Sequence, residues 1–105
     1  MKTIAARQLT SYLKQHPQAQ LIDLRSSHAY AASHVRGALN IPYEDGLIRE
    51  DLLNRGRELV FYCQRGGSAM AAARDLGEKG WDTTAVIGGY EDISRLTEIV
   101  SAYKI

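Results

Sequence analysis

Cys63 is the residue of this chain whose type and position best suit covalent chemistry. It follows an apolar run, residues 59–62, and precedes a Gly-Gly loop and an alanine-rich segment with helical spacing. The residues of that loop are Gln64, Arg65, Gly66, Gly67 and Ser68. A thiol placed where a strand ends and a helix begins faces backbone N–H groups that lack intrahelical acceptors. Such a position stabilises an anion on the sulfur, or on a group bound to it.

The two glycines allow this loop to form an anion-binding cradle. Gly66 and Gly67 tolerate a positive φ and let the backbone approach a ligand closely. Successive N–H groups then point inward, and the helix adds the positive end of its dipole. We therefore expect Cys63 to be largely thiolate near neutral pH, with the positive charge of Arg65 at the rim. Ser68 either turns its hydroxyl inward or caps the helix.

Two kinds of cysteine chemistry use such a cradle. Phosphoryl transfer through a cysteine requires a loop that holds three phosphate oxygens, usually closed by an arginine in the pattern Cys-x5-Arg. Here that closing position is Ala69, and Arg74 lies most of two turns further along the helix. Sulfur transfer instead places one terminal sulfur of a persulfide in the cradle, which suits a smaller loop. The sequence favours sulfur transfer, and an inert buried cysteine at a strand end is the structural alternative.

Composition limits the classes of protein that need to be considered. A chain of 105 residues, 45% hydrophobic and 24% charged, is typical of one globular domain, and we expect a single domain over 1–105. A net charge of +1 gives no indication of a nucleic acid or anionic membrane partner. Residues 1–7 lack the apolar core of a secretory signal, so we expect a cytoplasmic protein. A single cysteine excludes an internal disulfide, a Cys-x-x-Cys pair and a cysteine-cluster zinc site.

Helical and apolar segments alternate along the chain. Helices are predicted at residues 9–16, 26–32, 47–53, 68–79 and 90–103, the last with Ile93, Leu96 and Val100 facing inward. Strands are predicted at 21–24, 38–41, 59–62 and 83–87, with a turn at 34–37 and a short edge strand at Thr3 and Ile4. This order predicts an α/β fold: a mostly parallel sheet of four to five strands covered by helices on both faces. Such sheets bind ligands at the carboxyl ends of their strands, where Cys63 lies.

With these residues in view, the chain resembles the rhodanese family. Residues 21–25, with the sequence Leu-Ile-Asp-Leu-Arg, and residues 30–42 are similar to its first signature, and residues 60–68 to its active-site strand and loop. Gly80-Trp81 and Gly88-Gly89-Tyr90 resemble later landmarks of the family. Ser33 and Arg36 depart from the usual glycine and proline of the first signature. The resemblance implies the three-layer rhodanese-like fold and a single-domain sulfurtransferase.

The resemblance also implies a role for each site residue. Cys63 would be the persulfide-forming nucleophile, the amides of Gln64 to Ser68 the cradle, and Arg65 the group that neutralises an anionic donor. Asp23 and Arg25 would be structural support. The donor would be thiosulfate or a persulfide, and the acceptor a thiol, cyanide or a protein thiol, with no metal and no organic cofactor. A non-enzymatic sulfur-carrier or regulatory module is the main alternative; a cysteine phosphatase or arsenate reductase is less favoured.

Overall fold

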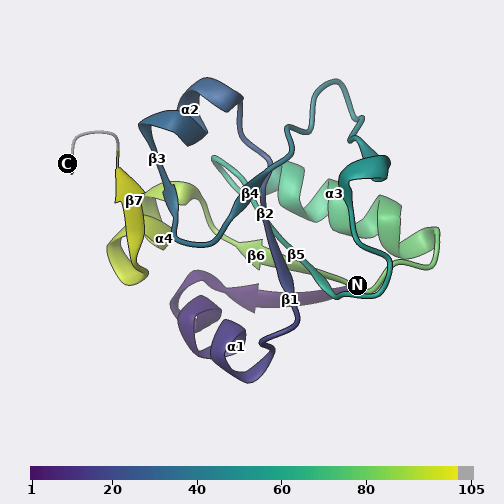
Figure 1. Ribbon diagram of the computed structural model, residues 1–105, viewed down its shortest axis with the longest axis horizontal. Helices are drawn as coiled ribbons and strands as arrows, with labels where there is room; N and C mark the ends of the chain where they lie inside the picture. Colours follow the sequence, from purple (N-terminus) through teal and green to yellow (C-terminus); the bar gives the residue numbers. More distant parts are fainter. Residues whose placement is uncertain (102–105) are drawn as a thin grey trace.

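The computed structural model describes residues 1–101, whose centre is a five-stranded sheet (Figure 1). In spatial order the strands are β1 (Lys2–Ala5), β6 (Thr83–Ile87), β5 (Leu59–Tyr62), β2 (Gln20–Asp23) and β4 (Leu39–Asn40). Every neighbouring pair in this sheet is parallel, so the carboxyl ends of all five strands meet at one edge. The α/β prediction with four to five mostly parallel strands is confirmed.

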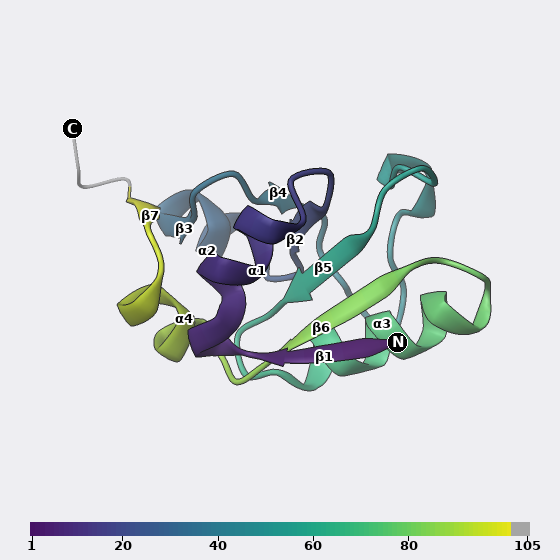
Figure 2. The ribbon, with the colours of Figure 1, turned by 90° about the horizontal axis from the view of Figure 1, so that it is seen from below.

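Strand β5 explains why both faces of the sheet are covered. All of its side chains are buried, and they alternate between two apolar clusters, as strand geometry requires. Leu59 and Phe61, continued by Cys63, pack on the face covered by α3 (Gly67–Glu78). Val60 and Tyr62 pack in the other cluster, which includes residues of α1 (Leu9–Gln15) and α4 (Tyr90–Leu96) (Figure 2). The central strand is thus buried on both sides, and its end carries the cysteine.

Most predicted elements occur within one or two residues of their expected bounds. Helix α1 ends just before His16 and Pro17, and α2 (Ser27–Ala32) has Ser26 as its N-cap, with its side chain accepting a hydrogen bond from the amide of Ala29. The edge strand at Thr3 and Ile4 is also confirmed, as part of β1. No helix within residues 1–101 combines the length and apolar character needed to cross a bilayer.

The predicted closing helix over 90–103 is wrong beyond Leu96. Helix α4 ends there, and the chain becomes extended at Thr97 and forms β7 (Ile99–Ser101). This strand pairs antiparallel with β3 (Ser33–Val35) in a separate two-stranded sheet. The β-branched pair Ile99 and Val100 suits a strand better than a helix. Ile93 is buried as expected, Leu96 is exposed, and residues 102 and 103 lie outside the described residues.

Two shorter predictions also need correction. Within 47–53 only a single 3₁₀ turn forms, Glu50–Leu52, because so short a segment gains little from local helix formation and leaves Leu47 and Leu52 exposed. The turn predicted at 34–37 begins later, because its first two residues belong to β3 and are held by the pairing with β7. A second 3₁₀ turn, Ala6–Gln8, connects β1 to α1.

Candidate sulfur site at the end of β5

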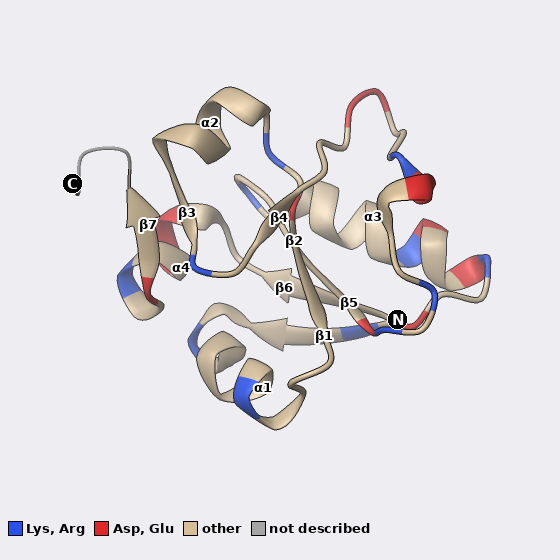
Figure 3. Cartoon of the chain, viewed as in Figure 1, with Lys and Arg blue, Asp and Glu red and all other residues tan. Residues whose placement is uncertain are grey.

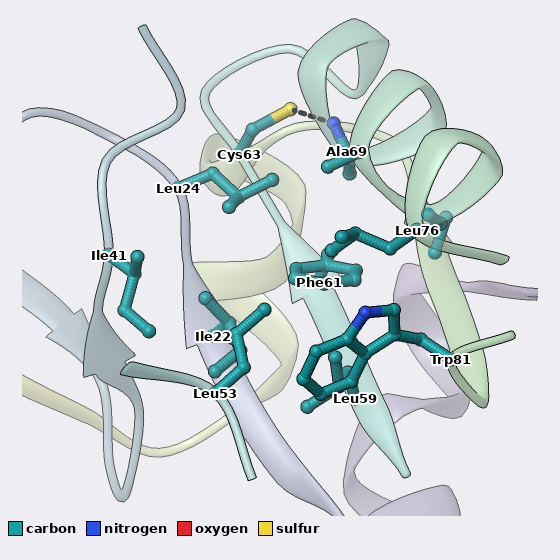
Figure 4. Packing of buried hydrophobic residues seen from close by; sticks show 13 residues of the cluster. Ile22, Leu24, Ile41, Leu53, Leu59, Phe61, Cys63, Ala69, Leu76 and Trp81 are labelled. Carbon is teal, nitrogen blue, oxygen red and sulfur yellow. Dashed lines mark hydrogen bonds between the residues drawn. The ribbon is translucent and has the colours of Figure 1, made fainter. Parts of the chain in front are cut away.

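Cys63 lies where β5 stops, with its side chain directed toward the amino end of α3 (Figure 4). Its sulfur accepts hydrogen bonds from the backbone N–H of Gly66 at 2.9 Å and of Ala69 at 3.3 Å. The residue is only 4% exposed and contributes to the apolar cluster that contains Leu24 and Phe61. The two N–H groups distinguish this sulfur from an ordinary core thiol, because they stabilise negative charge on it.

The predicted cradle extends one residue further than expected. Of the amides expected at residues 64–68, that of Gly66 bonds the sulfur, and the second donor is Ala69, outside the predicted range. Helix α3 begins at Gly67, so the N–H groups of Gly67 and Ser68 lie in its first turn, where no intrahelical acceptor exists. These two amides adjoin the sulfur-binding pair along the chain and can receive an additional anion.

Ser68 does not cap the helix. Gly66 is the N-cap residue of α3, with φ +100° and no side-chain hydrogen bond, and Ser68 lies two residues further on. A φ of +100° is strained for residues with a side chain, which explains a glycine at position 66. Within residues 1–101 the Ser68 hydroxyl makes no hydrogen bond, inward or to the backbone.

The surroundings of this helix end carry no negative charge from α3 itself. The first turn of α3 contains no acidic residue, and Figure 3 shows the charges of this helix gathered toward its carboxyl end. Arg65 is exposed in the loop and has no hydrogen-bond or ion-pair partner among the described residues. Its guanidinium is therefore available to an anionic ligand that approaches the loop.

Asp23 and Arg25 form a buried ion pair beside this loop. The guanidinium of Arg25 donates to both carboxylate oxygens of Asp23, with Nη2 to Oδ2 at 2.8 Å. Tyr62, the residue before Cys63, donates its hydroxyl to the same carboxylate at 2.6 Å and accepts from the amide of Val35. The pair thus connects the end of β2 to β5 and β3.

These contacts also determine the ionisation of the groups involved. Burial, reinforced by the hydrogen bond to Asp23, raises the pKa of Tyr62 far above its usual range, so this hydroxyl stays a neutral donor. Burial alone would lower the pKa of Arg25, but the hydrogen bonds and charge of Asp23 outweigh it and the pKa is raised. Burying either charge alone would be costly, so each is stable there only when it is paired with the other.

The contact between the turn after β6 and the Cys63 loop was not predicted from the sequence. The amide of Tyr90 donates to the carbonyl oxygen of Gln64 at 3.1 Å, and Gly66 lies against the backbone of Gly88. The available signal was topological: the Gly-Gly pair at 88 and 89 follows a strand that neighbours β5, and parallel neighbours end at the same edge. A separate cavity of about 390 Å³ is lined by Tyr43, Leu47 and Leu76, among other residues, and Cys63 does not line it.

Comparison with known proteins shows the family. The model of the rhodanese-like domain matches residues 6–96, and the chain therefore belongs to the rhodanese-like domain family. It is 30% identical over 74 residues to the thiosulfate sulfurtransferase GlpE of Haemophilus influenzae, covering 70% of each chain. It is 35% identical over 80 residues to the HIGH ARSENIC CONTENT 1 protein of Arabidopsis thaliana, over 65% of this chain, but spans only 47% of that protein's length.

The likeness to solved structures concerns the fold. The rhodanese-like domain of the Alr3790 protein from Anabaena superposes with a TM-score of 0.81 at 22% identity, covering 96% of this chain and 80% of that chain. The family thus defined includes proteins named sulfurtransferases, and the predicted membership is confirmed.

Proposed function

We propose that this protein is a sulfurtransferase that moves a sulfane sulfur from thiosulfate or a persulfide to a thiophilic acceptor through a persulfide on Cys63. The observation that carries the proposal is the pair of backbone N–H groups directed at the sulfur of Cys63 at the end of a parallel strand. Membership in the rhodanese-like family and a thiosulfate sulfurtransferase among the relatives support the same chemistry.

In the first half-reaction, the thiolate of Cys63 attacks the outer sulfur of thiosulfate. A new S–S bond forms, the original S–S bond breaks, and sulfite leaves with the bonding electron pair. The persulfide keeps one negative charge on its terminal sulfur. The amides of Gly67 and Ser68 are the nearest along the chain to stabilise that charge, and the exposed Arg65 neutralises the departing sulfite.

In the second half-reaction, an acceptor such as cyanide or a thiolate attacks the terminal sulfur. The S–S bond breaks and its electron pair returns to Cys63, which regenerates the thiolate. Because Cys63 is the only cysteine of the chain, no internal thiol can take the sulfur, and the transfer is intermolecular. Thiosulfate as donor, and cyanide, a small thiol or a protein thiol as acceptor, belong to this proposal.

Steady-state kinetics test the proposal. Initial rates with varied thiosulfate and cyanide are expected to give parallel double-reciprocal lines, because two half-reactions share one thiol. Cys63→Ser should abolish the rate while leaving the circular dichroism spectrum unchanged. Intersecting lines would contradict the double displacement. Absence of turnover in a protein that still takes up sulfur would instead support the sulfur-carrier alternative.

A further inference from the structure

The turn between β6 and α4 touches the Cys63 loop through backbone alone. A Cβ atom at Gly89 would lie 2.3 Å from the carbonyl oxygen of Gln64 and 3.1 Å from the Cα of Arg65. In return, a Cβ atom at Gly66 would lie 3.2 Å from the carbonyl oxygen of Gly88. Gly89 has a φ of −104°, which any residue adopts, so the need for glycine there is steric. Backbone atoms cannot swing aside as a flexible side chain does.

This close approach permits a hydrogen bond that fixes the loop. The N–H of Tyr90 donates to the carbonyl oxygen of Gln64 at 3.1 Å. Two residues further along, the N–H of Gly66 donates to the sulfur of Cys63 at 2.9 Å. The position of the Gly66 amide over the sulfur therefore depends on how closely Gln64 can approach the turn.

The turn itself is anchored to the buried ion pair. The ring of Tyr90 lies 3.7 Å from the guanidinium carbon of Arg25, and its hydroxyl donates to Ser33 at 2.9 Å. Arg25 is in turn held by Asp23. The loop thus rests on a support that is itself fixed to the end of β2.

We propose that Gly89 is a positioning residue for the Cys63 thiolate. By lacking a side chain it lets the Gln64 carbonyl reach the amide of Tyr90, and this contact keeps the Gly66 N–H on the sulfur. The inference builds on the proposed role of Cys63 as nucleophile. Every variant below leaves the charged groups of the surrounding segments unchanged. These groups are Arg65 in the loop, Arg25 behind Tyr90 and Asp92 near Gly88.

The first test compares Gly89→Ala with Gly56→Ala, measuring the rate of Cys63 alkylation by iodoacetamide across pH. A Cβ atom at Gly56 meets only the side chain of Asn54 at 3.5 Å, an ordinary contact in an exposed loop. Gly89→Ala should lower the rate at neutral pH by roughly tenfold and move the pH profile upward, as expected when a hydrogen bond to an anion is weakened. Gly56→Ala should match the wild type. An unchanged profile in folded Gly89→Ala would overturn the proposal.

A second pair of variants decides the matter even if Gly89→Ala does not fold. Tyr90 is the first residue of α4, where proline is well tolerated, and Gly89 before it is extended, as a residue preceding proline should be. Tyr90→Pro removes both the ring and the N–H, whereas Tyr90→Ala removes the ring alone. The proposal expects slower alkylation and a higher pH profile in Tyr90→Pro than in Tyr90→Ala. Identical profiles in the two variants would contradict it.

These measurements need no sulfur donor, so they separate the two proposals. If the alkylation profiles shift as expected and the wild type takes no sulfur from thiosulfate, the positioning role stands and the sulfurtransferase proposal fails. If the wild type transfers sulfur and the profiles do not shift, the opposite holds.

Discussion

Two neighbouring strand-to-helix junctions of this fold each contain a left-handed glycine, and they differ in charge. At each, a parallel strand runs through a glycine with a left-handed φ into a helix: Gly66, with φ +100°, after β5, and Gly88, with φ +102°, after β6. Helix α4 carries Glu91 and Asp92 in its first turn, whereas the first turn of α3 has no acidic residue. Helix α3 is also the longer of the two, with 12 residues against 7.

The difference indicates which junction can receive an external anion. Acidic side chains in a first turn satisfy the positive end of a helix, so the end of α4 is neutralised by its own residues. At α3 that role is left to the sulfur of Cys63, which takes two of the free N–H groups. Both junctions therefore place a left-handed glycine between a strand and a helix. Under the proposed function, their side chains give the junction after β6 a supporting role and the junction after β5 a chemical one.

The most direct test of this comparison gives the first turn of α3 an acidic residue, as the first turn of α4 has. Ser68→Asp places a carboxylate in the first turn of α3, one residue before the Ala69 amide that donates to the sulfur of Cys63. Sulfur transfer from thiosulfate should fall by about a hundredfold, since like charges a few ångströms apart near a surface repel by several kcal/mol. The uncharged, equally sized Ser68→Asn should keep most of the activity.

The stability of Ser68→Asp shows whether its loss of activity comes from the added charge or from misfolding. An added carboxylate at a helix start stabilises the helix by about 0.3–1 kcal/mol, so the free energy of unfolding of Ser68→Asp should not fall. Urea denaturation measures it. Equal activities in the Asp and Asn variants would show that the charge of this turn has no effect on the chemistry.

A second prediction concerns the ion pair that supports both junctions. Tyr62→Phe removes a hydroxyl that donates to Asp23 at 2.6 Å and accepts from Val35, and leaves both groups buried without it. The free energy of unfolding should fall by about 2 kcal/mol. Tyr43→Phe is the matched control: its half-buried hydroxyl donates to Asp75 at 3.2 Å, and its loss should cost less than half as much. Equal losses in the two variants would argue against a supporting network at Asp23.

The rim of the α3 junction yields a smaller effect. Arg65→Gln removes the exposed, unpartnered charge, so KM for thiosulfate should rise about three- to tenfold at low ionic strength, with less change in added salt. Lys14→Gln, which removes one exposed positive charge from α1, is the control and should leave KM unchanged. If both variants raise KM equally, net charge and not Arg65 attracts the donor.

The smallest effect belongs to the supporting junction. Glu91→Gln removes a first-turn carboxylate of α4 and its exposed ion pair with Arg95, and should lower the free energy of unfolding by about 0.5 kcal/mol. Sulfur transfer should stay at the wild-type rate. If folded Glu91→Gln instead transfers sulfur more slowly than the wild type, α4 carries charge that is needed at the site.

Much of this arrangement could be predicted from local sequence signals. The apolar run before Cys63, the Gly-Gly loop and the alanine-rich helix specify a strand, a tight turn and a helix in immediate succession, so the strand end and the direction of the sulfur follow from short-range geometry. The parallel sheet follows equally from the alternation of strands and helices.

The parts that escaped prediction depend on contacts between distant segments. Strand β7 forms because Ile99 and Val100 pair with β3, more than sixty residues earlier, and nothing local reveals that partner. The hydrogen bond from Tyr90 to Gln64 likewise joins two turns that meet only when β5 and β6 are neighbours. The role of Ala69 was not predicted, because its backbone N–H is the donor and residue type does not reveal which backbone N–H groups bind the sulfur.

The central claim, that the amides at the start of α3 hold an anionic sulfur able to carry a second one, is tested by intact mass. The protein is incubated with thiosulfate, freed of excess donor and weighed before and after treatment with cyanide. The account predicts a gain of one sulfur atom on the wild type, its removal by cyanide, and no gain on Cys63→Ser. A wild type that gains no sulfur, or a gain that survives Cys63→Ser, would contradict it.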